Sequence, residues 1–535
     1  MAWGNTVGVA SWVERLKRND PGLTSVTVFR GRLFGPEEAA EVCEALKSNS
    51  HLRELYASGH KMDAATAGLF ADMLAVNTSL RSLCIGDPEF GDEGLAALTR
   101  GIASSASLEA IDLENKGVGD EGAKALGEAL SSGGCNALTN LNLARNDALG
   151  EVGIVAVCAG AVSGDTLESL TLAGVSLSDG ACRALGDLLA SSCPLKTLDL
   201  TGATVGETGA ARIGEGLAAR GHEGRRLDAL VMDSVALGDA GVVALVGAGG
   251  CLPVVALSLQ GCGIGEEGGV AIAGMMRSTD NKNGDIVVEV LNLRDNRIGD
   301  AGALALAAAL GEEGSRIVDD EGITITGGGG DHGLRGVRVL DVGSNGLGPA
   351  GASELVRHAS TTLQNLSLFG NEAISDNGID GILEAAGAGT AGGASSFLRV
   401  LDIGGCGVEE AGLVRACEVL MRTAPPSDAD ADADGRMAER GDGINAGDDA
   451  PDESLSLSFS LFPELETLVV GGNPGVQGDA WEVTLGRLRD VRPRLDVAWR
   501  AADAGDDHQS RQQGQQLLEQ YRGLERQQGG KEEEN

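Results

Sequence analysis

The sequence predicts an α/β solenoid, in which one short strand and one helix repeat along most of the 535-residue chain. Three observations predict it: an apolar motif that recurs at a nearly constant interval, a high glycine content, and a scarcity of aromatic side chains. Glycine contributes 83 residues and aromatic residues only 3% of the chain. A chain with so few aromatics must build its core from many small aliphatic side chains. Stacked copies of a small unit achieve this, because each copy buries its apolar faces against its neighbours.

The recurring motif is Leu-x-x-Leu-x-Leu-x-x-(Asn/Cys/Gly)-x-(Leu/Ile/Val). Clear copies run from Leu138 to Asn146 and from Val288 to Ile298. The first seven copies start 28 to 30 residues apart, and so regular a spacing indicates a repeat architecture. The motif starts at fourteen positions: Leu23, Leu52, Leu80, Leu108, Leu138, Leu167, Leu195, Leu227, Val254, Val288, Val337, Leu363, Leu398 and Leu465.

Each part of the motif predicts a local structure. The Leu-x-Leu stretch alternates with a period of two, which predicts a short strand with apolar side chains on one face. The Ala- and Leu-rich stretch that follows is amphipathic at helical spacing. Stacking is therefore expected to give a parallel sheet with helices on one side. The ninth position, where the chain leaves the strand, often carries a side chain that can satisfy backbone groups of the turn: Asn146, Asn296, Asn345, Asn371, Asn473, Cys262 and Cys406.

These residues resemble the leucine-rich repeats of the ribonuclease inhibitor type, a class that includes repeats of NOD-like receptors and Ran GTPase-activating proteins. The resemblance covers residues 23–421 and 463–480. It implies a leucine-rich-repeat solenoid with the shape of a horseshoe, with parallel strands on the concave face and helices on the convex face. It specifies a fold more closely than a function, because the class includes inhibitors, receptor sensors and GTPase activators.

Departures from the repeat divide the chain. The amphipathic stretch from Val9 to Arg18 is expected to cover the open apolar edge of the first repeat. The acidic insertion lacks the apolar surface needed to fold alone, and the tail carries a single apolar stripe without sustained heptads. The expected organisation is an N-terminal cap at 1–22, repeats one to thirteen at 23–421 with a Gly-rich insertion at 311–336, an acidic disordered insertion at 422–462, the last repeat and C-terminal cap at 463–500, and a Gln-rich, mostly disordered tail at 501–535.

The charge of the chain restricts its partners. There are 41 Lys and Arg residues against 79 Asp and Glu residues, a formal net charge of −38. Such a chain repels nucleic acid and anionic membranes, and attracts basic proteins. The ten Cys residues are too sparse for a disulfide framework and lack the Cys-x2-Cys spacing of zinc sites, so we expect reduced, mostly buried thiols. With no secretory signal pattern at the N-terminus, we predict a cytoplasmic monomer, with nuclear or perinuclear location as an alternative.

Two motifs suggest small-ligand sites, and both have a simpler explanation. Gly263-x-Gly265-x-x-Gly268 matches a dinucleotide-binding fingerprint. It lies at the helix start of a repeat, however, and its acidic residues would repel a pyrophosphate there. We therefore interpret it as a repeat turn and expect no cofactor.

The second motif lies in the acidic insertion. Asp430, Asp432 and Asp434 have the spacing that begins an EF-hand calcium loop. The twelfth position is Gly441 instead of the bidentate glutamate, and no helical pair flanks the loop. We expect a solvated acidic linker, with a weak Ca²⁺ site as the alternative.

The remaining candidates are side chains on the face of the strands opposite the helices. They occupy the third, fifth, seventh and eighth positions of the motif, where nine acidic residues outnumber Arg30, Arg145 and Arg294. This excess of acid predicts a basic partner with fast, salt-sensitive association. Aromatic side chains at these positions are candidate hot spots. The predicted partner-binding residues are Phe29, Arg30, Glu54, Tyr56, Asp87, Asp112, Glu114, Asp199, Asp233, Asp295, Asp341, Phe369 and Asp402.

We accordingly predict a non-enzymatic scaffold that binds a protein partner on the concave face. No Walker A sequence, zinc-protease motif or local catalytic arrangement of the six His residues appears. The first alternative follows from the resemblance: a Ran-type GTPase-activating protein would use an early arginine, for which Arg30 and Arg32 are the candidates. A small GTPase is then the partner. The second alternative is a sensor-type repeat domain related to NOD-like receptors.

Overall fold

The computed structural model describes residues 9–132, 137–247, 252–277, 288–313, 336–359, 363–391, 398–423 and 462–498. These residues form two compact units, the first ending at Asn296 and the second beginning at Arg297. The insertion at 311–336 lies almost wholly outside the described residues. The acidic insertion with Asp430, Asp432 and Asp434, and the tail at 501–535, lie outside them as well.

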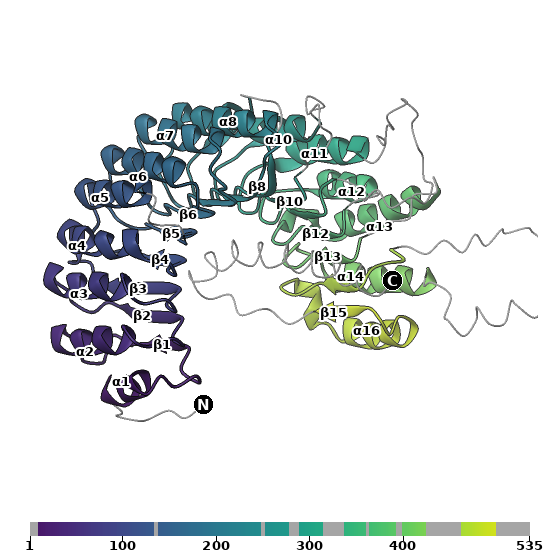
Figure 1. The fold of residues 1–535 in the computed structure, drawn as a ribbon. Helices are drawn as coiled ribbons and strands as arrows, with labels where there is room; N and C mark the ends of the chain where they lie inside the picture. Colours follow the sequence, from purple (N-terminus) through teal and green to yellow (C-terminus); the bar gives the residue numbers. More distant parts are fainter. Residues whose placement is uncertain are drawn as a thin grey trace, which may run out of the picture. The chain divides into compact units, whose positions relative to one another are not determined.

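The described part of unit 1 contains a sheet of ten strands, which follow one another in sequence order (Figure 1). Every neighbouring pair is parallel. The strands are β1 (Ser25–Thr27), β2 (Glu54–Ser58), β3 (Ser82–Gly86), β4 (Ala110–Asp112), β5 (Asn140–Asn142), β6 (Ser169–Thr171), β7 (Thr197–Asp199), β8 (Leu227–Val231), β9 (Val254–Ser258) and β10 (Val290–Asn292).

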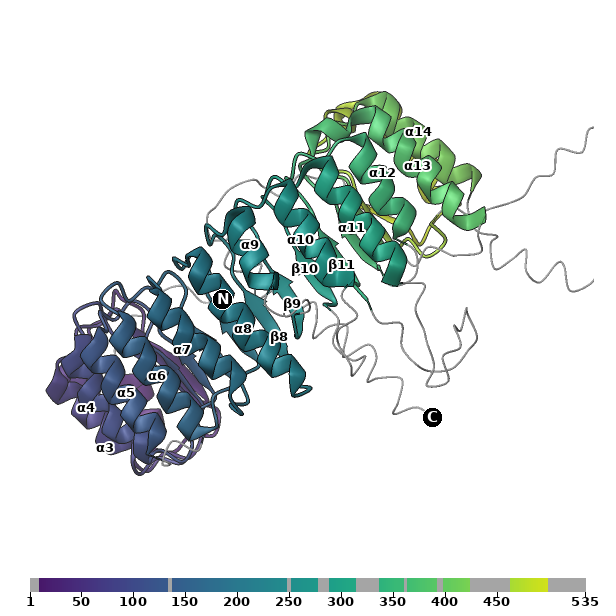
Figure 2. The same ribbon diagram turned by 90° about the horizontal axis from the view of Figure 1, so that it is seen from above.

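Helices cover one face of this sheet (Figures 1 and 2). Before the first strand, α1 (Val9–Lys17) packs on the first repeat: Val13 and Leu16 are buried, and the Asn49 amide donates to the Leu16 carbonyl oxygen at 3.1 Å. One helix then follows each of the first nine strands: α2 (Pro36–Leu46), α3 (Ala64–Leu74), α4 (Gly91–Ser104), α5 (Asp120–Ser131), α6 (Glu151–Gly164), α7 (Asp179–Ala190), α8 (Glu207–His222), α9 (Gly238–Gly247) and α10 (Glu266–Arg277).

Unit 2 repeats this arrangement with parallel strands in its own sequence order. Short 3₁₀ turns, η1 (Glu372–Ile374) and η2 (Pro474–Gln477), precede two of its helices. The described elements are α11 (Gly299–Glu313), β11 (Val339–Asp341), α12 (Pro349–His358), β12 (Asn365–Ser367), α13 (Ser375–Ala391), β13 (Val400–Asp402), α14 (Glu410–Arg422), β14 (Thr467–Val469), α16 (Asp479–Val491) and β15 (Asp496–Ala498).

The core of unit 1 lies between the sheet and its helices. One apolar residue of each strand from β2 to β10 is at most 3% exposed, for example Leu55, Ile111 and Leu198. These residues occupy one register row across the sheet, as in the pairing of Leu83 with Ile111. Because successive side chains of a strand alternate between faces, the residues beside them lie on the opposite, helix-free face. The predicted fold class, a solenoid of strand–helix repeats, is confirmed.

The asparagines of the ninth position hold the turns together. Asn146 is fully buried, and its Oδ1 accepts the backbone N–H groups of Lys116 and Val118, both at 3.0 Å. Its Nδ2 donates to the carbonyl oxygens of Leu113 and Leu143, both at 2.9 Å. One side chain therefore joins two consecutive repeats, as expected from the need to pair turn backbone groups. Cys262 occupies the same position with a single sulfur, which donates to the Met232 carbonyl oxygen at 3.1 Å.

Candidate functional site

The helix-free face of unit 1 carries two register rows of side chains. The central row, which runs from β1 to β10, consists of Thr27, Tyr56, Cys84, Asp112, Asn142, Thr171, Asp199, Val231, Ser258 and Asn292. The parallel row consists of Ser25, Glu54, Ser82, Ala110, Asn140, Ser169, Thr197, Ala229, Ala256 and Val290. The register thus places Tyr56, Asp112 and Asp199 on a single line across the sheet.

Backbone N–H groups fix the carboxylates of the central row. Asp112 Oδ1 accepts the N–H of Glu114 at 2.9 Å and the side-chain amide of Asn142 at 3.0 Å. Asp199 Oδ1 accepts the N–H of Thr201 at 2.9 Å and its hydroxyl at 2.6 Å. This bond to the N–H two residues later is the Asx turn that Asp and Asn favour. These carboxylates therefore both shape the end of their strand and present negative charge.

Two arginines on this face lie close to carboxylates and partly offset their negative charge. Arg145 Nε lies 3.6 Å from Glu114 Oε1, and Arg294 Nε lies 3.7 Å from Asp295 Oδ2. Lys116, which sequence analysis did not select, occupies the ninth position of its repeat and is buried; its Nζ donates to Ser58 Oγ at 2.7 Å. The sequence did contain a signal for this residue, because a lysine stands at the motif position where other repeats have asparagine.

The two aromatic candidates of unit 1 differ in exposure. Phe29, in the turn after β1, is 68% exposed. Tyr56 is half-buried in the central row, and its hydroxyl oxygen lies 3.3 Å from Ser82 Oγ, which donates to it. Arg30 is exposed, and its side chain lies against Gly59, whose missing Cβ leaves it room. Arg32 is exposed in the same turn.

The other acidic candidates of unit 1 differ in solvent exposure. Glu54 and Asp295 are exposed, whereas Asp87, Asp112, Glu114 and Asp199 are half-buried. Three further candidates, Asp341, Phe369 and Asp402, belong to unit 2 and are half-buried at the sheet of that unit. There Asp341 and Asp402 each accept the backbone N–H two residues later, at 2.8 Å.

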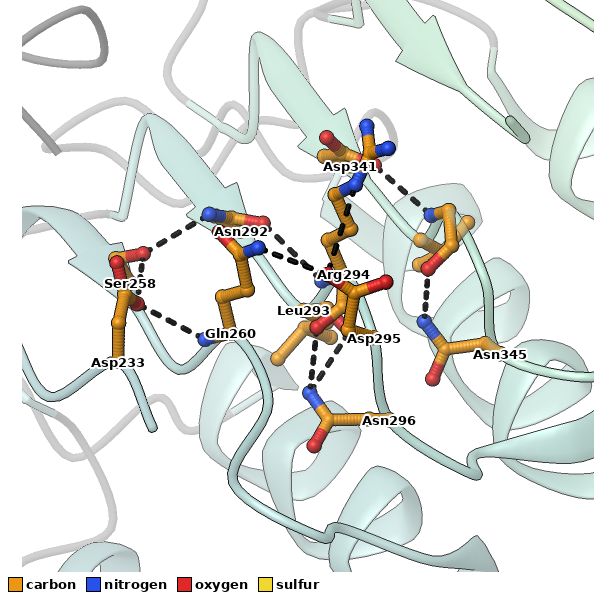
Figure 3. A network of polar contacts seen from close by, with 12 residues as sticks. Asp233, Ser258, Gln260, Asn292, Leu293, Arg294, Asp295, Asn296, Asp341 and Asn345 are labelled. Carbon is orange, nitrogen blue, oxygen red and sulfur yellow. Dashed lines mark hydrogen bonds and ion pairs between the residues drawn. The ribbon is translucent and has the colours of Figure 1, made fainter. Parts of the chain in front are cut away.

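Asp233 departs from the expectation of an exposed charge. It is only 3% exposed, and burial raises the pKa of its carboxyl to about 6. Its Oδ1 accepts the Ser258 hydroxyl and the Gln260 backbone N–H, the latter at 3.0 Å. Figure 3 shows this group continuing along the end of the sheet: Asn292 donates to Ser258 Oγ at 3.0 Å, and Gln260 Nε2 donates to Asp295 Oδ2 at 2.8 Å. We name Asp233, Ser258, Gln260, Asn292 and Asp295 the Asp233 network.

The interpretation of the dinucleotide fingerprint as a repeat turn is supported by its contacts. The N–H groups of Gly265 and Gly268, which would face a phosphate, instead donate to Asp239 Oδ1 at 2.6 and 2.9 Å. The same arrangement recurs where Asp120 Oδ1 accepts the N–H groups of Gly150 and Gly153, both at 2.8 Å. A carboxylate of one helix thus occupies the positive N-terminal end of the next helix.

The described residues offer little chemistry for catalysis or metal binding. Eight cysteines are described, and all are free and buried. Burial raises the pKa of the Cys84 and Cys406 thiols to about 12, which keeps both protonated near neutral pH. No group of three or more His, Cys, Asp or Glu side chains in this part of the chain could hold a metal ion. Among the described helices, none combines the length and hydropathy needed to cross a bilayer.

Comparison with known proteins agrees with the repeat. A family model described as "Leucine Rich repeat" matches residues 250–273, 286–307, 337–356 and 359–383. The ribonuclease inhibitor of Sus scrofa is 28% identical over 325 residues, which cover 59% of this chain and 63% of the inhibitor. The match therefore spans less than two thirds of the length of that relative.

Solved structures similar to the chain share little sequence with it. The Rad7–Elc1 complex of yeast matches with 14% identity and a TM-score of 0.41, covering 93% of this chain and 94% of that chain. An internalin from Listeria monocytogenes matches with 12% identity and a TM-score of 0.37, covering 74% and 93%. The repeat motif, the parallel strand–helix units, the family model and the inhibitor similarity agree. The chain is therefore similar to leucine-rich repeat proteins, and among them to a ribonuclease inhibitor.

Proposed function

We propose that the chain is a non-enzymatic scaffold that binds a protein with a basic surface on the helix-free face of unit 1. The observation that carries this proposal is a pair of hydrogen-bonded, half-buried carboxylates, Asp112 on β4 and Asp199 on β7, in one register row of this face. Because hydrogen bonds already hold these groups, a partner cation would meet them at little cost in side-chain ordering. Repeat proteins of this kind use such extended faces for binding.

Charge and aromatic exposure support the same face. Glu54 and Asp295 add exposed negative charge at either end of the sheet, so a basic protein would be steered toward it. Phe29 is the largest exposed aromatic contribution near that face and is the expected anchor, since aromatic side chains dominate interface energetics. Cytoplasmic location and a monomeric state remain predictions from the sequence.

The binding proposal is tested by capture from lysate with the full chain and a neutralised face. The triple variant D112N/E114Q/D199N removes three charges, while the amide oxygens can keep the Asx turns. The matched control E121Q/E128Q neutralises exposed residues of α5, on the helix side. We expect the wild type and the control to capture basic proteins from the lysate. The triple variant should not capture them, and about 0.5 M NaCl should release them from the wild type. Retention by the triple variant, or capture of acidic proteins alone, would contradict the proposal.

A Ran-type GTPase-activating role is the second candidate, favoured by the exposure of Arg30 and Arg32 in one turn. A small GTPase would be the partner, and the arginine would stabilise charge on the transferring phosphoryl group. Adding the full chain to GTP-loaded small GTPases and measuring hydrolysis decides it. Acceleration that R30A or R32A abolishes would establish this role and displace the non-enzymatic proposal. A sensor-type repeat domain related to NOD-like receptors is the third candidate.

A further inference from the structure

The helix-free face of β8–β10 is deeply buried, and four of its six register-row residues are apolar, the other two being Ser258 and Asn292. Ala229, Val231, Ala256 and Val290 are 1%, 7%, 2% and 0% exposed. The corresponding residues of β6 and β7 are half-buried and polar: Ser169, Thr171, Thr197 and Asp199. The described helices of unit 1 all lie on the opposite face (Figures 1 and 2), so none of them accounts for this burial.

A polar atom at the edge of the same face needs a donor. Gln260 is only 9% exposed, and its Nε2 is used in the bond to Asp295 (Figure 3). Its Oε1 is buried and has no hydrogen-bond donor among the described residues. Because buried carbonyl oxygens are nearly always paired, this atom marks a position where an occupant donates a hydrogen bond.

The chain itself contains a segment that fits this surface. Leu517, Leu518, Tyr521 and Leu524 recur at helical spacing and would form one apolar stripe. Residues 509–528 contain three basic and two acidic residues, a charge of 3 − 2 = +1 within a chain of −38. The face beside the patch is acidic through Asp199 and Asp295, and the many glutamines of the segment supply amide donors.

We propose that residues 509–528 dock on the helix-free face of β8–β10, with the leucine stripe against Ala229, Val231, Ala256 and Val290 and a donor on Gln260 Oε1. The segment begins about ten residues after Ala498, the last described residue. Docked there, the segment occupies the same sheet face that we assign to the partner and competes with it. The docking itself does not depend on the existence of that partner.

Photo-crosslinking of the full chain tests the docking. With p-benzoylphenylalanine in place of Tyr521, irradiation and mass spectrometry are expected to find links to peptides containing residues 227–235, 254–262 or 288–296. The variant L517S/L518S should reduce the yield of these links about tenfold or more, because two apolar anchors are lost. The matched control Q512S/Q513S should change it less than about twofold. Neither variant alters the repeats, so folding is not at risk.

Mixing isotope-labelled and unlabelled chains separates the possible occupants. Links within one chain support the proposal. Links only between chains would show that a second copy covers the face and would overturn the proposal. Links to other strands, or link yields that L517S/L518S does not reduce, would overturn it as well. Because the readout needs no partner protein, a negative result here leaves the basic-partner proposal standing, and failure of that proposal leaves this one standing.

Discussion

At the residue scale, the turns of the repeats depend on single buried side chains. Asn146 pairs two N–H groups of the preceding turn and carbonyl oxygens on both sides of its own strand end. The sulfur of Cys262 donates to carbonyl oxygens of the corresponding turn and offers at best a weak acceptor. An amide is therefore worth more at this position than a thiol, because it supplies both strong donors and a strong acceptor.

Replacing Asn146 with alanine should lower the free energy of unfolding by about 2–4 kcal/mol. The change leaves buried N–H and carbonyl groups unpaired, and each such group carries a desolvation penalty. Urea denaturation of the full chain measures the effect. N140A is the matched control, because Asn140 is exposed on β5 and should cost less than about 0.5 kcal/mol. Equal losses for the two variants would refute the role given to Asn146.

Asp233 makes stability depend on pH in an unusual direction for a carboxyl. Its pKa, normally 3.8, is raised to about 6 by burial. The native state therefore holds a proton that the unfolded state releases between about pH 4 and pH 6. Stability on this account is highest below pH 4, falls across that window, and is lowest above pH 6. The difference of about two pKa units corresponds to about 3 kcal/mol.

The variant D233N should be more stable than the wild type above pH 6, by up to about 3 kcal/mol, and close to it at pH 4. An amide oxygen can still accept from Ser258 and Gln260 without a buried charge. Unfolding free energies of both proteins at pH 4 and pH 8 give the comparison. A difference that does not depend on pH would show that Asp233 is ionised throughout.

At the element scale, glycines set how closely neighbouring helices approach. A Cβ on Gly127 of α5 would overlap the carbonyl oxygen of Ala156 in α6, and a Cβ on Gly160 would overlap the Gly127 backbone. Backbone atoms cannot move aside as a flexible side chain can. Gly274 of α10 is different, since it is exposed and no atom lies within 4 Å of its would-be Cβ.

G127A should therefore lower the free energy of unfolding by about 2 kcal/mol or more, because it forces α5 and α6 apart. G274A should raise it by about 0.5–1 kcal/mol, since alanine is the better helix former and meets no neighbour. Denaturation of both variants beside the wild type measures the pair. The critical result is that the two changes in unfolding free energy have opposite signs. Destabilisation by both variants would show that helix contact at Gly127 is not the cause.

At the scale of the whole molecule, net charge opposes folding. A formal charge of −38 repels itself in the compact state, and the many exposed ion pairs, such as Lys61 with Glu89 at 2.6 Å, offset only a little of it. Carboxylates at helix N-termini, such as Asp120, place part of the charge where it is favourable. The rest remains a repulsion that salt can screen.

Raising NaCl from about 20 mM to about 500 mM should increase the melting temperature of the chain, because screening weakens the repulsion of the folded state more than it weakens the scattered surface pairs. Differential scanning calorimetry at constant pH provides the measurement. Sodium sulfate at the same ionic strength should stabilise further, since it also strengthens apolar burial. A melting temperature that falls with NaCl would mean that ion pairs outweigh the net charge.

The sequence by itself determined the repeat. Period-two alternation and helical spacing are local patterns, and the turn role of Asn146 follows from the bonding capacity of one side chain. The sequence also argues against a dinucleotide site at Gly263 to Gly268, because two acidic residues lie within the motif itself.

Only the tertiary structure decided which side chains of the strand face are exposed. Asp233 and Asp199 occupy similar positions in the sequence pattern, yet one is buried in a network with Ser258 and Gln260 while the other is half-exposed. The partners that make this difference lie some 25 residues away, in the next repeat. Burial, and with it the pKa and the unpaired Gln260 oxygen, arises from contacts between repeats, which no single repeat encodes.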